Sequence, residues 1–315
     1  MHRLIPLAFL AAFMTCAAEA RCEETIGQAD ADVFVAAQRR DADDDPQSSY
    51  IRARAIAWLK AVDRAAEALS ARQDIRLVVP DIEDRRALAA QIYALCAQPP
   101  RAEGDLPHVV VILQPRMSLA EDTAFALRRP QLLRLWRVVM EEVRSADKET
   151  DVLKGLWLVR EAIAPTPEGM LVSATSLSAL SEAVRLAPRS SAARLALAEA
   201  QLQQGLTEQC ALSCDAVLAL RPDLPRARYV RALALMALGR LALAEDDVNA
   251  LMASEQHADG PEMASLLHAR GTIRLLRGRH DGMCEDYTAA CGLGDCDGLS
   301  EARVKGYCKN AAVSP

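Results

Sequence analysis

Residues 191–223 read SAARLALAEAQLQQGLTEQCALSCDAVLALRPD, and the landmarks of this segment return at a fixed interval along the chain. A small residue, a Gly and a Pro each recur 34 residues later in the chain. The recurring pairs are Ala198 and Ala232, Gly205 and Gly239, and Pro188 and Pro222. A constant interval of about 34 residues, with a loop Gly and a terminal Pro, is typical of stacked helical hairpins.

Two further segments keep the same frame. Residues 227–252 read ARYVRALALMALGRLALAEDDVNALM, and residues 265–295 read SLLHARGTIRLLRGRHDGMCEDYTAACGLGD. The third segment follows at a slightly longer step, with the extra length in the polar stretch 254–262, where an exposed loop tolerates insertion. Each segment has a helical apolar period, a Gly turn and a second helical period. We expect close helix contact at Ala198, Ala232 and Gly271, and left-handed turns at Gly205, Gly239 and Gly278.

These segments resemble tetratricopeptide repeats. The residues that carry the resemblance are Ala198, Gly205, Val217 and Pro222, then Ala232, Gly239, Ala244 and Leu251, then Gly271, Gly278, Tyr287 and Ala290. The family's early aromatic residue is missing, and Cys210, Met283 and Arg274 depart from the usual residue types. The third unit is therefore degenerate, as terminal repeats often are. The stretch 157–188 is a candidate for a worn fourth unit, interrupted by the turn-prone APTPEG.

The predicted fold class is mainly α, a helical-hairpin solenoid preceded by a mostly helical N-terminal region with at most two short strands. The predicted parts are a signal peptide (1–20), an N-terminal domain (21–150) and a repeat domain (151–315). Within the repeat domain we expect units at about 157–190, 191–224, 225–258 and 264–295, followed by a capping helix at 297–308. In the N-terminal domain, periodicity predicts helices at 50–69, 84–96 and 131–143. The β-branched runs 74–81 and 108–115 are either two strands or buried extended connectors.

Residues 1–20, MHRLIPLAFLAAFMTCAAEA, have a basic start, an apolar core and a small-x-small end, as in a secretory signal. An uncleaved anchor is the alternative. A lipoprotein is disfavoured because neither Cys16 nor Cys22 follows a small residue. We expect an exported protein, periplasmic or secreted, with no membrane span after cleavage. The net charge of −6, without basic runs and interleaved aromatics, disfavours nucleic acid as a partner.

Cleavage after residue 20 would leave eight cysteines, an even number that suggests disulfides in an exported chain. Cys284 and Cys291 lie too far apart on one helix to pair with each other. If the final segment folds back, Cys291 meets Cys296 and Cys284 meets Cys308. Zinc is the alternative for these four thiols, although their spacing lacks the short pairs of structural zinc sites. Cys22 and Cys96 form a candidate pair by elimination.

Cys210 and Cys214 are four residues apart, on one face of a helix. One reading makes them buried thiols or a strained structural bridge. The other interpretation makes them a redox or copper-binding pair. In that case the chain would be a thiol-redox or metal-handling periplasmic protein, which is the alternative function. We predict no cofactor or metal.

No catalytic motif is present, so the sequence nominates no catalytic residue and favours a non-catalytic scaffold of the cell envelope. A catalytic N-terminal domain, which would need a cleft with paired acids, is the alternative, and the sequence identifies no candidate residues for it. The family resemblance implies a concave groove that binds a peptide or a partner helix. The implied lining is Leu195, Glu199 and Leu202, then Arg226, Tyr229, Leu233 and Met236, then His268, Thr272 and Leu275. Arg226 and Tyr229 are the best anchors by residue type, and the alternative is that these side chains are only solvated or packed in the core.

Overall fold

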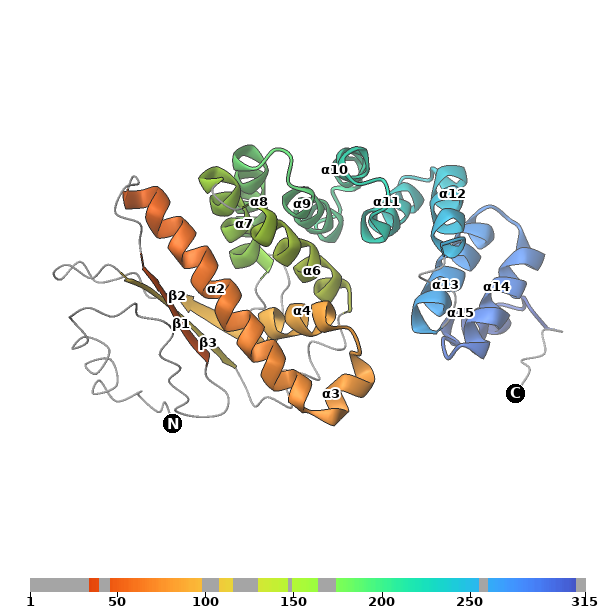
Figure 1. The fold of residues 1–315 in the computed structure, drawn as a ribbon. Helices are drawn as coiled ribbons and strands as arrows, with labels where there is room; N and C mark the ends of the chain where they lie inside the picture. Colours follow the sequence, from red (N-terminus) through yellow and green to blue (C-terminus); the bar gives the residue numbers. More distant parts are fainter. Residues whose placement is uncertain are drawn as a thin grey trace.

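The computed structural model describes residues 34–39, 46–97, 108–115, 130–146, 149–163, 174–254 and 260–309. This part of the chain is mainly helical (Figure 1). A small sheet and several helices at one end are followed by helical hairpins that succeed one another toward the C-terminus. The predicted signal segment and Cys22 lie outside the described residues.

The sheet has three strands, β1 (Phe34–Arg39), β2 (Tyr93–Ala97) and β3 (His108–Pro115). β3 lies between the other two and pairs antiparallel with both. Val111 and Leu113 on β3 and Ala36 on β1 are buried, and Ala36 pairs directly with Val111. Because alternate residues of a strand share a face, these side chains define one buried face of the sheet. Helix α2 (Pro46–Ala71) packs against β1 and β3.

Two expectations for the N-terminal region were wrong, and a third was right only in part. The run 74–81 is neither a strand nor a buried connector: residues Gln73–Val78 form helix α3, with Leu77 and Val78 76% and 62% exposed. The run 108–115 is a strand, β3, and the helix expected at 84–96 is confirmed as α4 (Ile82–Ile92) but stops where β2 begins. With β1 and β2, which were not predicted, the described residues form three strands rather than at most two. Strand pairing between distant segments overrides the local period here.

The other two N-terminal helices are confirmed. The segment expected at 50–69 lies within α2, and the segment at 131–143 lies within α6 (Pro130–Ser145). The two helices meet through Trp58 and Trp136, whose ring centroids are 6.2 Å apart. A stripe of fully buried small residues on α2, Ala57, Ala61 and Ala65, allows its neighbours to approach closely.

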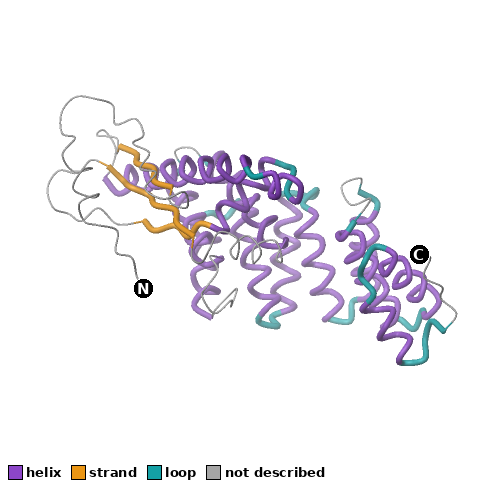
Figure 2. Tube along the Cα trace, turned by 90° about the horizontal axis from the view of Figure 1, so that it is seen from below, coloured by secondary structure: helices purple, strands orange, loops and turns teal. Residues whose placement is uncertain are grey.

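Four helical hairpins follow, and each packs against the next (Figure 2). They are α7 (Thr150–Ile163) with α8 (Ala174–Leu186), α9 (Ser191–Gln203) with α10 (Thr207–Leu220), α11 (Pro225–Ala237) with α12 (Leu241–Met252), and α13 (Pro261–Leu276) with α14 (His280–Gly292). The stretch 157–188 proposed as a worn fourth unit covers the second half of α7 and all of α8, so the first hairpin begins earlier than expected. A single buried cluster runs from the sheet to α11, so the core continues across the predicted boundary at 150.

The three predicted glycine turns are confirmed. Gly205, Gly239 and Gly278 have φ values of 72°, 70° and 71°, in the left-handed region. In each turn the glycine and the next residue donate backbone hydrogen bonds to the last turn of the preceding helix; Leu206 N, for example, lies 2.8 Å from Gln201 O. These two hydrogen bonds end the helix without leaving its last carbonyl groups unpaired. The same glycine turn therefore reverses the chain direction between the two helices of each of these three hairpins.

A single tyrosine joins the last hairpin to the capping helix α15 (Asp297–Val304). Tyr287 is buried, and the Cδ1–Cε1 edge of its ring lies close to both Gly271 of α13 and Gly298 of α15. A Cβ atom added at either glycine would lie 2.6 Å from the Tyr287 ring. The Tyr287 hydroxyl lies 3.0 Å from Thr272 Oγ1. The small residue expected at position 271 is therefore required by helix contact.

The four C-terminal cysteines lie in two pairs at disulfide distance, in the arrangement expected from the fold-back of the final segment. Cys284 and Cys308 have Cα atoms 5.3 Å apart, and Cys291 and Cys296 have Cα atoms 4.0 Å apart. Cys284, Cys291 and Cys308 also pack against a small apolar cluster that includes Met283 and Tyr287. This geometry favours staples for α15 over a zinc site.

We predict that Gly271→Ala lowers the free energy of unfolding by about 1–3 kcal/mol, because the new methyl group overpacks against Tyr287. Gly292→Ala on α14 is the matched control, since nothing lies within 4 Å of its added Cβ atom. Urea unfolding of both variants measures the difference. Equal stability of the two variants would contradict the proposed contact.

We also predict that peptide mapping of the non-reduced protein finds Cys284 joined to Cys308 and Cys291 joined to Cys296. Replacing Cys284 and Cys308 together by Ser should destabilise the cap by roughly 2–4 kcal/mol, because the unfolded chain regains its freedom. Free thiols at all four positions, or a different pairing, would reject the stapled cap.

Candidate functional site

Helix α6 runs along the array of hairpins and contacts the chain at or just before the starts of α9, α11 and α13. The Glu142 carboxylate accepts hydrogen bonds from the hydroxyls of Ser190 and Ser191 and from Ala192 N, the last at 3.0 Å. Farther along the array, Arg221 Nη1 lies 3.2 Å from Glu141 Oε2, and Arg134 Nη2 lies 2.8 Å from Glu262 Oε1. The N-terminal region thus holds three successive hairpins in place.

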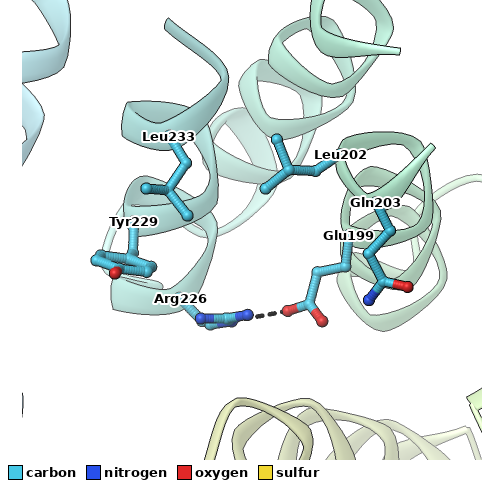
Figure 3. A pocket seen from close by; sticks show the side chains of 6 residues that line it. All are labelled: Glu199, Leu202, Gln203, Arg226, Tyr229 and Leu233. Atoms are coloured by element: carbon cyan, nitrogen blue, oxygen red, sulfur yellow. Dashed lines mark hydrogen bonds and ion pairs between the residues drawn. The ribbon is translucent and has the colours of Figure 1, made fainter. Parts of the chain in front are cut away.

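A pocket of about 300 Å³ opens between α9 and α11 (Figure 3). Its lining consists of Glu199, Leu202 and Gln203 from α9 and Arg226, Tyr229 and Leu233 from α11. Five of these six residues belong to the lining that the family resemblance implies. Gln203 was missed, although its place directly after Leu202, at the end of the first helix of its unit, was a usable signal.

An ion pair closes one rim of the pocket. Arg226 Nε donates to Glu199 Oε1 at 2.7 Å, and the two side chains are only 13% and 8% exposed. The Arg226 guanidinium also lies 5.6 Å from the centroid of the Tyr229 ring. In Figure 3, Leu202 and Leu233 reach into the pocket from opposite helices. The pocket combines an apolar wall with a polar rim whose formal charges cancel.

The structure does not bring the other predicted lining residues into this pocket. Leu195 is fully buried, because α9 packs against α6 and α7 as well as against α8 and α10. It belongs to the core, so its assignment to a partner surface is corrected. Met236 packs against the cluster between α11 and α13, and Leu275 packs against the cluster under the cap.

His268 and Thr272 lie farther along the array, on α13. His268 Nδ1 is 3.1 Å from Asp295 Oδ2, and Thr272 Oγ1 bonds the backbone of His268 as well as the hydroxyl of Tyr287. These two side chains therefore contact Asp295, which lies just before the capping helix α15, and Tyr287, which packs against that helix.

Other buried acids in the described part of the array are paired with arginines. Asp247 binds Arg231, and in the next hairpin Asp286 binds Arg270 in the same way. The Asp247 contact is the main reason that the pKa of Arg231 is raised. Such pairs complete the packing between the two helices of a hairpin, and neither carboxylate is left free for proton transfer.

Glu245 is a third buried acid, and Arg274, Arg277 and Arg279 surround it. Burial alone would raise the pKa of Glu245. The hydrogen bond from Arg274 and the charges of Arg279 and Arg277 outweigh burial and hold that pKa below its ordinary value. Glu245 therefore stays ionised and contributes stability that falls as the pH drops through its folded pKa.

Cys210 and Cys214 are free thiols, fully buried on α10. The hydrogen bond between the two thiols, followed by burial, raises the pKa of Cys214, whereas the same hydrogen bond lowers the pKa of Cys210. A thiol with a raised pKa, such as Cys214, is a poor nucleophile and a poor metal ligand, and full burial keeps both thiols away from reagents and metal ions in solvent. Within the described residues, no three His, Cys, Asp or Glu side chains are grouped so that they could hold a metal ion. The geometry favours the reading of Cys210 and Cys214 as core residues.

The second repeat unit supplies a matched variant for these thiols. Ala244 and Val248 occupy the equivalent buried positions in that unit. We predict that Cys210→Ala/Cys214→Val changes the free energy of unfolding by less than about 1.5 kcal/mol, because the replacements are apolar and of similar size.

The native thiols should react with a disulfide reagent only at the rate at which the protein unfolds, as followed by thiol titration. Rapid native-state reaction, or stoichiometric binding of Cu(I), would contradict the packing role of Cys210 and Cys214.

Among the helices in the described ranges, none combines the length and the apolar character needed to cross a bilayer. Comparisons with family models, curated proteins and solved structures gave no match. The function must therefore be inferred from the pocket and from the repeat pattern.

Proposed function

We propose that this chain is a non-catalytic binding protein built from tetratricopeptide-type hairpins, and that it holds a peptide or a partner helix at the pocket between α9 and α11. The single observation that carries the proposal is the composition of this pocket. It gathers Glu199, Leu202, Arg226, Tyr229 and Leu233, which the resemblance to tetratricopeptide repeats implies for a partner-binding face.

The chemistry of the pocket supports a peptide ligand. Leu202, Leu233 and Tyr229 offer apolar and aromatic surface to a side chain. Arg226, Glu199 and Gln203 offer hydrogen-bond donors and acceptors at the rim. A few convergent polar groups around an apolar centre are what fixes a ligand and its orientation.

The compartment belongs to the same proposal. Two cysteine pairs at disulfide distance fit an oxidising environment outside the cytoplasm. The signal-like character of residues 1–20 points the same way. We therefore place the binding function in the cell envelope or in the secreted fraction.

The test is selection of ligands from a random-peptide display library on purified protein. Leu202→Asn/Leu233→Asn should weaken the selected peptides at least about tenfold, because the apolar wall becomes polar. The measurement is the dissociation constant by fluorescence anisotropy, with circular dichroism to verify folding.

The matched control is Leu212→Asn/Leu243→Asn, which makes the same replacements at side chains that are 63% and 55% exposed on α10 and α12, outside the pocket. This control should bind as the unaltered protein does. Equal binding by both double variants, or no selected peptide at all, would refute binding at this pocket.

A further inference from the structure

The charges that line the pocket cancel within the pocket itself. Arg226 is the one cation of its lining and Glu199 the one anion, and they bind each other at 2.7 Å. Both side chains are largely buried, so water screens their attraction weakly. A ligand carboxylate would have to compete with Glu199 for Arg226, and a ligand ammonium would have to compete with Arg226 for Glu199. Either charge would enter a partly desolvated site without a free counter-charge, which is costly.

The same ion pair still leaves hydrogen-bonding capacity for an uncharged ligand. Within the described residues, the Nε–Oε1 contact is the only hydrogen bond of either side chain. The two Nη groups of Arg226 remain donors, and the second oxygen of Glu199 remains an acceptor. Gln203 adds an amide that can donate and accept. Paired donors and acceptors of this kind match the N–H and C=O groups of a peptide backbone.

The apolar wall limits the size of what the pocket takes. Leu202 and Leu233 face each other across it, and the Tyr229 ring lies beside Leu233 on α11 (Figure 3). A volume of about 300 Å³ is at the lower end of the range for small-ligand pockets. The space suits one large apolar side chain with its flanking backbone.

We infer that this pocket, if it is the peptide site proposed above, selects an apolar side chain within an uninterrupted, uncharged stretch of peptide and rejects a chain-terminal carboxylate. Glu199 sets this selectivity by neutralising the charge of Arg226. Removal of the Glu199 charge should leave the guanidinium charge uncompensated, so Glu199→Gln should convert the pocket into one that prefers a carboxylate.

Two small probes that differ only in this charge test the inference. N-acetyl-leucinamide represents an internal residue, and N-acetyl-leucine represents a chain terminus. Titration of each into the full chain is followed by methyl NMR of Leu202 and Leu233, with Leu212 as an internal reference outside the pocket. The amide probe should shift both pocket methyl groups and bind at least about tenfold more tightly than the acid. In Glu199→Gln, the order of the two probes should reverse.

Two results would overturn the inference. One is that the unaltered protein binds the acid as well as or better than the amide. The other is that neither probe moves the Leu202 and Leu233 signals. Retained peptide binding in the library experiment would then show that the binding function stands and only its selectivity was misassigned. Unchanged methyl spectra outside the pocket verify that Glu199→Gln is folded, and Leu233→Asn should abolish the response to the amide probe.

Discussion

Close helix contact at a few glycines is the constraint on which this structure depends. Gly271 and Gly298 leave room for the Tyr287 ring, and Gly155 packs its backbone against α8, where an added Cβ atom would lie 2.9 Å from Ala183 O. The left-handed glycines then reverse the chain in the same way in successive hairpins. The spacing between the small contact residue and the turn is seven residues in each of the three units, from Ala198 to Gly205, from Ala232 to Gly239 and from Gly271 to Gly278.

The same geometry explains why charged groups are buried in an array of this kind. The two helices of one hairpin bring Arg231 onto Asp247, and those of the next hairpin bring Arg270 onto Asp286. Glu199 and Arg226 differ because they join two neighbouring hairpins. Their contact lies at the open side of the packing, beside apolar side chains. An interaction that stabilises the stacking is therefore also the rim of the candidate site.

Features of the molecule that depend on local sequence patterns were predicted better than features that depend on contacts between distant segments. The glycine turns, the hairpins after residue 191 and the fold-back that brings Cys284 near Cys308 all follow from spacings of about one repeat or less. The sheet pairs β1 with β3 although three helices and β2 lie between them in the chain. The β-branched run 108–115 marked β3 as a candidate strand, but no pattern marked β1 or its pairing with β3. Leu195 was misassigned for a similar reason, because it is fully buried on a helix that packs against α6 and α7 as well as against its neighbours in the array. Tertiary packing of this range has no local signature.

The two ends of the array are closed by different means, and this bears on where a ligand can bind. At the C-terminal end, the cysteine pairs and Tyr287 hold a short helix over the last hairpin. Toward the other end, the continuous core and the Glu142 contacts fuse the array to the sheet and its helices. An array of stacked hairpins exposes apolar faces at both ends unless they are capped. Between these two covered ends, the surface between α9 and α11 brings apolar side chains together with hydrogen-bonding groups of Arg226, Glu199 and Gln203 in one pocket of the described part of the chain.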